Sequence, residues 1–265
     1  MLFRGVARRS SALDRTGMEL PNPYAAPRDA VASPNPTSSL DRPFTSAWDV
    51  LARSVGVYVS NFGMLVVIAL VVHAPAELLV AVLIDGVGIP TLLVTTAIDM
   101  VLGAIAGAAA IHAIVQHADG NASGVVETLA AGARRAPAVL WARIAGGIAI
   151  GMGLLALIVP GLMLLVRFSL GDAVATLERP AGFGALDRSS VLVRGKGWRV
   201  SFALLTIIAV TWALGYAGVT LATRFPHWAV TAATQLLQDL VGLLIPVFAL
   251  VAYLGLGGRE RASAS

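Results

Sequence analysis

The sequence predicts an all-α integral membrane protein with about six transmembrane helices, and three observations support this. Hydrophobic residues make up 57% of the 265 residues, and the mean hydropathy is +0.80. Charged residues make up only 13%, about half the share found in ordinary soluble domains. The apolar residues are also gathered into runs close to the ~20 residues that cross a hydrocarbon layer about 30 Å thick.

Six such runs are the predicted spans, at 62–84, 91–115, 136–159, 161–177, 198–220 and 230–256. Three other segments, 44–59, 123–135 and 183–194, place apolar residues at three- and four-residue spacing opposite a polar face. This pattern is typical of amphipathic helices that lie in a membrane interface. An amphipathic helix followed by a pair of spans therefore occurs three times along the chain.

The predicted membrane domain covers residues 44–258. Residues 1–43 are polar, rich in Pro, Ser and Arg, and without a periodic apolar face, which predicts a disordered cytoplasmic tail. No apolar run of signal-peptide type occurs in them, so a cleaved signal is not expected. The Asn-Pro-Tyr-x-x-Pro phrase after Met18 makes Met18 an alternative start, and a proline-rich linker is the other interpretation. Residues 259–265 are predicted to form a short cytoplasmic tail.

The basic residues predict how the chain is oriented. Loops on the cytoplasmic side of a membrane carry an excess of Lys and Arg. With the amino terminus inside, all 19 Lys and Arg fall on the cytoplasmic side except Arg224, in an outer loop, and Arg167, in the fourth span. Arg143 is counted with the cytoplasmic charges. We therefore expect a multi-pass protein of a bacterial inner membrane, with both termini cytoplasmic, and no nucleic-acid partner.

Four charged residues fall inside the predicted spans at similar depth: Glu77, Asp99, Arg167 and Asp239. At 1.5 Å per residue they lie roughly 9–14 Å below the outer surface. An unpaired charge at that depth costs several kcal/mol, so we predict a cluster centred on Arg167, with Asp99 and Asp239 as partners and Glu77 as a looser member. Such a cluster is either an ion or proton relay, the floor of a polar cavity, or a structural salt bridge that fixes helix order.

Pro160 and Gly161 separate the third and fourth spans. This pair predicts a helix break that closes a tight hairpin, with a gating hinge as the alternative. Two stretches with glycines four residues apart, 103–107 and 147–151, are typical of close helix packing, within the chain or between two copies.

The densest basic patch consists of Arg188, Arg194, Lys196 and Arg199 beside Trp198. These residues are candidates for binding anionic lipid head groups, at about 1 kcal/mol per charge, and positive charge that only sets topology is the alternative. The chain has no cysteine, and we identify no nucleophile, metal-ligand set or cofactor loop. The expected protein is not an enzyme and has no cofactor. Its expected partners are membrane lipids, a second copy, or another membrane protein.

The block from 157 to 199 carries a family likeness. It contains a Pro-Gly turn, Glu178 near the end of the next helix, Ala-Leu-Asp-Arg-Ser at 185–189 and Arg-Gly-Lys-Gly-Trp at 194–198. The block resembles the membrane domain that some bacteria fuse to glycerophosphodiester phosphodiesterases, and also stand-alone relatives of that domain. The resemblance extends from about Phe44 to the carboxyl terminus and departs at Arg167 and Asp172, where the family has apolar residues. The chain has no soluble α/β segment for the catalytic domain, so the resemblance implies an architecture and no activity.

Two functions are expected from these observations. The first is a non-enzymatic membrane protein that supports envelope or lipid organisation or the assembly of a partner. The alternative is a small transporter or channel that uses the intramembrane charges. A polar cavity that connects these charges to one side would favour transport, whereas a filled, dry interior would favour the first function.

Overall fold

The computed structural model describes residues 40–83, 89–121, 123–178, 182–225 and 227–258. All regular secondary structure in these residues is helical. Six stretches are long and apolar enough to cross a membrane: Phe62–Val80, Leu93–Ala118, Val125–Ala156, Ile158–Leu177, Gly197–Arg224 and Trp228–Gly255. The predicted all-α, six-span fold is confirmed.

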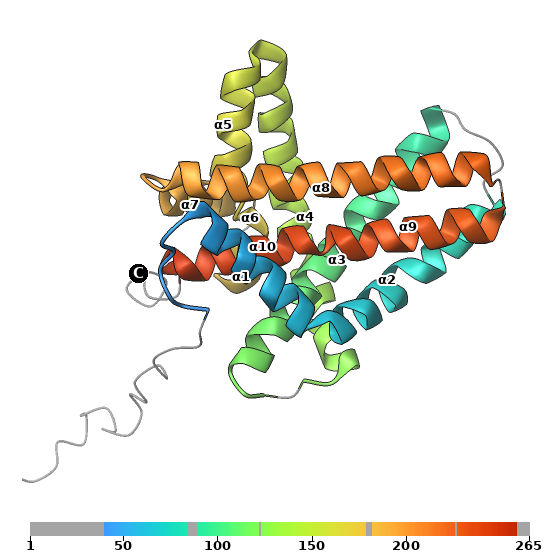
Figure 1. Ribbon diagram of the computed structural model, residues 1–265, viewed down its shortest axis with the longest axis horizontal. Coiled ribbons are helices and arrows are strands. Elements are labelled where there is room, and N and C mark those ends of the chain that lie inside the picture. The colour runs from blue at the N-terminus through green and yellow to red at the C-terminus, as the bar shows by residue number, and fades with distance from the viewer. Residues whose placement is uncertain (1–39, 84–88, 122, 179–181, 226, 259–265) are drawn as a thin grey trace, which may run out of the picture. The chain divides into compact units, whose positions relative to one another are not determined.

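The helices follow one another in the order α1 (Ala47–Ser60), α2 (Phe62–Leu83), α3 (Ile89–Ala118), α4 (Val125–Ala156), α5 (Ile158–Phe168), α6 (Gly171–Leu177), α7 (Phe183–Val193), α8 (Gly197–Arg224), α9 (Trp228–Gly242) and α10 (Leu244–Gly255). The ends of α2 and α8 and the starts of α3 and α9 lie at one end of this group, to the right in Figure 1. α1, α7 and the start of α8 gather at the opposite end. The α4–α5 hairpin projects away from the other spans, and its tip stands clear of them (Figure 1).

The core is built around α10, which is buried from Pro246 to Gly255. The alanine-rich second half of α3 contributes a second buried stretch. Leu40 and Phe44 are also buried, and the Phe44 ring lies against Gly255. Leu40, which falls at the end of the segment predicted to be a tail, thus packs on the core, whereas Arg42 and Pro43 are exposed. The rest of that prediction, residues 1–39, and the predicted tail at 259–265 lie outside the described residues.

α1 begins with its own capping interactions. The Ser46 side chain accepts a hydrogen bond from the backbone N–H of Asp49, and Arg53 pairs with Asp49 at 2.7 Å. The pKa of Asp49 is lowered because the backbone N–H of Thr45 donates to its carboxylate and Arg53 lies beside it. Ionised Asp49 therefore stabilises the fold above its unfolded pKa, and this contribution is lost as the pH falls through the folded value. Trp48 is 65% exposed, as expected of a helix with an apolar face toward lipid.

Three predicted helix boundaries differ from the structure. The amphipathic segment 123–135 and the third span form one continuous helix, α4, with Pro137 inside it. The fourth span is broken between α5 and α6, and the sixth is interrupted at Leu243, between α9 and α10. Pro246 has no backbone N–H, so the carbonyl of Gly242 has no helical donor at this second break.

The hairpin turn lies three residues before the predicted break at Pro160 and Gly161. Leu157 has extended backbone, with φ −163° and ψ 144°, and separates α4 from α5. Pro160 sits in the first turn of α5, where a helix does not need its N–H. Gly161 permits close contact between the two helices, because a Cβ there would lie 2.7 Å from the backbone nitrogen of Leu154. The tight hairpin is thus present, but Pro160 and Gly161 do not form the break.

Gly132 permits the close approach of α3 and α4. A Cβ at this position would lie 2.7 Å from the carbonyl oxygen of Ile105 and 2.7 Å from the Cβ of Ala109. We expect Gly132→Ala to lower the free energy of unfolding by about 2 kcal/mol, because the backbone of α3 must move to admit the methyl group. Thermal unfolding in detergent, followed by circular dichroism, measures this loss.

Gly151→Ala is the matched control for this substitution. Gly151 lies on the same helix, and a Cβ there would meet nothing within 4 Å. The control should leave stability unchanged or slightly raised, because alanine is a better helix former than glycine. An equal loss of stability in both variants would contradict the proposed packing of α3 on α4.

Candidate functional site

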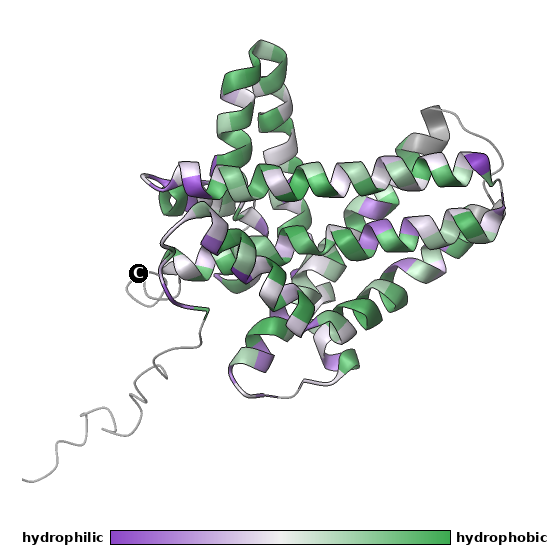
Figure 2. Ribbon diagram, in the orientation of Figure 1, coloured by the Kyte–Doolittle hydropathy of each residue, from purple (hydrophilic) through white to green (hydrophobic). Residues whose placement is uncertain are grey.

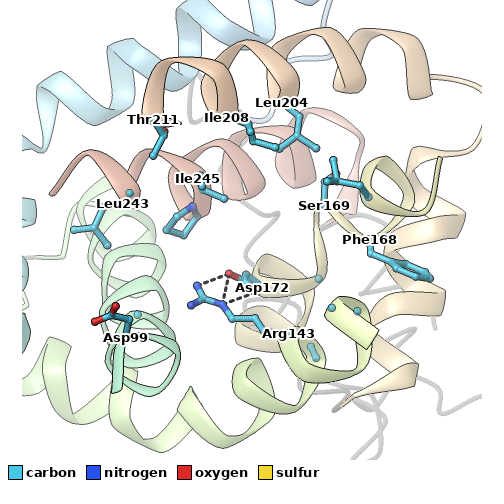
Figure 3. Close-up of a pocket in the computed structure, with 18 of the residues that line it drawn as sticks. Asp99, Arg143, Phe168, Ser169, Asp172, Leu204, Ile208, Thr211, Leu243 and Ile245 are labelled. Carbon is cyan, nitrogen blue, oxygen red and sulfur yellow. Dashed lines mark hydrogen bonds and ion pairs between the residues drawn. The ribbon is translucent and has the colours of Figure 1, made fainter. Parts of the chain in front are cut away.

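A cavity of about 550 Å³ lies at the base of the α4–α5 hairpin, where this hairpin meets α3, α6 and the α8–α10 region (Figure 3). Its lining has a polar part and an apolar part. The polar side chains come mainly from α3, α4, α6 and α9: Asp99, Arg143, Asp172, Gln235, Gln238 and Asp239. The apolar side chains come from α4, α5, α7, α8 and the α9–α10 region, and those on α5 and α8 are Leu165, Phe168, Leu204 and Ile208.

Arg143 and Asp172 both line the cavity and form an ion pair in its wall. Arg143 Nη2 lies 2.7 Å from Asp172 Oδ2, and Nε donates to the same oxygen at 3.0 Å. The guanidinium thus binds the carboxylate through two nitrogens, which is the strongest geometry for this pair. Arg143 comes from the middle of α4, and Asp172 from the first turn of α6, just after the break in the fourth span.

Arg143 occupies one of the two glycine faces that we interpreted as helix-packing surfaces. A Cβ at Gly103 would lie 3.0 Å from Arg143 Nη1, and a Cβ at Gly107 would lie 3.1 Å from Nη2. These glycines of α3 therefore make room for a guanidinium as well as for α10, whose Pro246 lies against Gly107. At the second face, a Cβ at position 147 or 151 would meet nothing within 4 Å, so that face packs against no helix in the described residues.

The predicted cluster centred on Arg167 is wrong in its choice of arginine. The Arg167 side chain is exposed, is not part of the cavity lining, and forms no ion pair among the described residues. The reason is its position on α5. Leu165 and Phe168 are three residues apart and face the cavity, which turns Arg167 to a different side of the helix.

The three predicted carboxylates do lie together. Asp99 and Asp239 line the cavity, and Glu77 is close enough to interact electrostatically with each of them. Figure 3 shows Asp99 on α3, on the other side of the Arg143 guanidinium from Asp172. None of the three forms an ion pair in the part of the chain that the structure describes. Asp239 Oδ2 is buried and accepts no hydrogen bond there.

His73 contributes a second buried polar atom to the cavity lining. Its side chain is only 4% exposed. The backbone of Ala69 lies near the ring, but Nδ1 has no hydrogen-bond partner among the described residues. An unsatisfied buried polar atom costs about 1–3 kcal/mol, so a ligand that supplied a partner here would gain from this contact.

The four candidate lipid-binding residues do not behave alike. Arg188 forms an ion pair with Glu178, with Nε and Oε2 2.8 Å apart, so it is not a free head-group ligand as predicted. Arg199 is exposed and donates from Nη1 to the carbonyl oxygen of Phe44 at 3.1 Å. Arg194 and Lys196 are exposed, and these two retain the geometry of the prediction.

Ser189 has a structural role that sequence reasoning did not find. Its Oγ donates to the carbonyl oxygen of Arg167 at 2.7 Å and accepts from the N–H of Leu170 at 3.1 Å. Both groups belong to the break between α5 and α6, where helical hydrogen bonds are missing. Ser189 thus stabilises the break that presents Asp172 to the cavity.

No protein-family model, curated protein or solved structure matches the chain. The resemblance to the membrane domain of glycerophosphodiester phosphodiesterases therefore stays a prediction.

Proposed function

We propose that this multi-span membrane protein is a non-enzymatic carrier that binds an ammonium cation in exchange for protons. The observation that supports this most is the excess of carboxylates at the cavity. Asp172 is paired with Arg143, but Asp99, Asp239 and the neighbouring Glu77 have no basic partner in the described residues.

Unpaired carboxylates inside a membrane must be neutralised. Leaving such a charge without a partner costs several kcal/mol, so each carboxylate takes up either a proton or a cation from a ligand. A cation that binds between Asp99 and Asp239 therefore displaces protons from them. This exchange couples movement of the cation to movement of protons in the opposite direction.

The size and chemistry of the cavity favour an organic cation. A volume of about 550 Å³ is within the ~300–1,000 Å³ of small-molecule pockets. No group of three or more His, Asp or Glu side chains in the described residues is arranged to hold a metal ion. Gln235 and Gln238 add amide groups to the lining, which suit a ligand with additional polar atoms.

The cavity also favours transport over the first function expected from the sequence. A role in envelope organisation needs no polar space between the spans, whereas a carrier does. Support of envelope or lipid organisation, or of partner assembly, stays a prediction that no structural observation strengthens.

Proton movement across proteoliposomes tests the proposed function. We expect protons to leave vesicles containing the protein when an amine is added outside, either as ethanolammonium or as the short-chain amphiphile dihexanoyl-phosphatidylethanolamine. Asp99→Asn and Asp239→Asn should each reduce the initial rate roughly tenfold, because each removes one exchangeable charge. A pH-sensitive dye inside the vesicles gives the rate.

Asp187→Asn is the matched control. Asp187 is exposed on α7 and is not part of the cavity lining, so its variant should keep the wild-type rate. Proton movement that neither amine elicits, or that survives Asp99→Asn and Asp239→Asn unchanged, would contradict the proposed carrier.

A further inference from the structure

We propose that the cavity receives its cation from the bilayer: the ligand is a membrane amphiphile with an ammonium head group, which enters sideways beside the α4–α5 hairpin. This inference rests on the proposed function and names the substrate class of the same site. It depends on the two-part lining of the cavity, on the exposure of the hairpin, and on polar atoms that have no partner.

The lining of the cavity is itself amphipathic. α5 and α8 supply Leu165 and Ile208, α3 and α9 supply Asp99 and Asp239, and α4, α7 and α10 add further apolar side chains. A small soluble cation would leave the apolar part in contact with water. An amphiphile instead places its head group against the carboxylates and its chains against the leucine and isoleucine, which buries apolar surface on both partners.

The hairpin carries the apolar part out into the hydrocarbon region. Its tip stands clear of the other spans (Figure 1), and its residues are mainly hydrophobic (Figure 2). Below the tip, Ile148 is 59% exposed, Met152 61% and Met163 54%. No helix packs on these side chains in the described residues, so in a bilayer they contact acyl chains. A chain that lies along α5 thus continues from the hydrocarbon into the cavity.

The polar atoms at the cavity match a head group with both charges. Asp99 and Asp239 face an ammonium group. Arg143 uses Nε and Nη2 for Asp172, and its Nη1 makes no hydrogen bond in the described part of the chain. His73 Nδ1 is also buried, and it has only the backbone of Ala69 nearby, without a hydrogen bond of good geometry. Arg143 Nη1 and His73 Nδ1 can contact the phosphate or ester oxygens of the amphiphile. A free amine has no such oxygens.

Protection of the carboxylates from chemical modification tests the inference. In detergent, a hydrophobic carbodiimide should modify Asp99 and Asp239, and mass spectrometry of peptides measures the extent. We expect dihexanoyl-phosphatidylethanolamine to protect both sites at a concentration roughly 100-fold lower than ethanolammonium, because its chains add buried methylenes. Dihexanoyl-phosphatidylglycerol, which has the same chains and no amine, should not protect.

A tryptophan introduced among the apolar lining residues distinguishes binding of the amphiphile's chains from binding of its head group. Ile208→Trp should abolish protection by the amphiphile and keep protection by ethanolammonium, which also shows that the variant is folded. Leu205→Trp is the control, because Leu205 is on the same helix but is 42% exposed and is not part of the cavity lining. In this control variant, both amines should protect Asp99 and Asp239 as they do in the wild type.

The outcomes distinguish the two proposals. Equal protection by ethanolammonium and the amine lipid, or equal loss of both in Ile208→Trp, would overturn the amphiphile and leave the carrier of ammonium cations standing. Equal protection by the two lipids would overturn recognition of the amine. Absence of protection by either amine would overturn the proposed function together with this inference.

Discussion

Replacing Arg143 with leucine is expected to lower the free energy of unfolding by about 3 kcal/mol. The substitution removes the three hydrogen bonds from Arg143 to Asp172 and leaves that carboxylate without its ion-pair partner. Breaking a buried ion pair from one side costs about 3–5 kcal/mol. We expect the lower end of this range, because the Arg143 and Asp172 side chains are 26% and 17% exposed. Equilibrium unfolding in mixed micelles, followed by circular dichroism, gives the value.

Two further variants show where the loss comes from. In Arg143→Leu with Asp172→Leu, no charge is left unpaired, so stability should return to within about 1 kcal/mol of the wild type. Arg194→Leu removes an exposed arginine from the segment between α7 and α8. It should change stability by less than about 0.5 kcal/mol. A double variant as unstable as Arg143→Leu alone would contradict the ion pair as the cause.

The carboxylates of the site could be predicted because depth in a span is visible in a sequence. Glu77, Asp99 and Asp239 each stand alone in an apolar run, at similar distances from the outer end of the span. Charges at one depth of a compact bundle are close to one another, and the cost of burying them singly favours grouping. The structure places all three at or beside one cavity.

The arginine could not be predicted in the same way. Arg143 lies six residues after Pro137, inside the predicted third span and close to the amphipathic segment 123–135, and it is counted there with the cytoplasmic charges. The structure joins both into the single helix α4, which carries Arg143 along α3 to the glycines at 103 and 107. Because Arg167 lies within an apolar run, the cluster was predicted to be centred on it. Its position on α5 turns it away from the cavity.

The helix breaks depend on contacts that are distant in the sequence. Ser169 and Gly171, in the run from Leu164 to Leu177, permit an interruption but do not require one, because single Ser and Gly residues also occur inside helices. The break is stabilised by the Ser189 hydroxyl, 19 residues beyond Leu170, and local propensity contains no information about such a partner. Pro160 and Gly161 predicted a break at a position where the helix is continuous, since the first turn of a helix accommodates proline without a break.

Glu178 is the second position where a large effect is expected. Its Oε2 pairs with Arg188 Nε at 2.8 Å, and its Oε1 accepts from the Tyr253 hydroxyl at 2.8 Å. This carboxylate therefore connects the end of α6 to α7 and to the buried helix α10. Glu178→Ala should lower the free energy of unfolding by about 2–3 kcal/mol, because it leaves a half-buried guanidinium whose Nη2 already lacks a partner.

A graded series distinguishes the charge from the hydrogen bond. Tyr253→Phe should cost about 1 kcal/mol, the usual value of one hydrogen bond. Glu178→Gln keeps an acceptor for the tyrosine but removes the charge that pairs with Arg188, so its loss should fall between those of Tyr253→Phe and Glu178→Ala. If Glu178→Gln proved as stable as the wild type, the pair with Arg188 would contribute nothing. The Glu178 and Ala-Leu-Asp-Arg-Ser features would then require an explanation other than the attachment of α6 and α7 to the core.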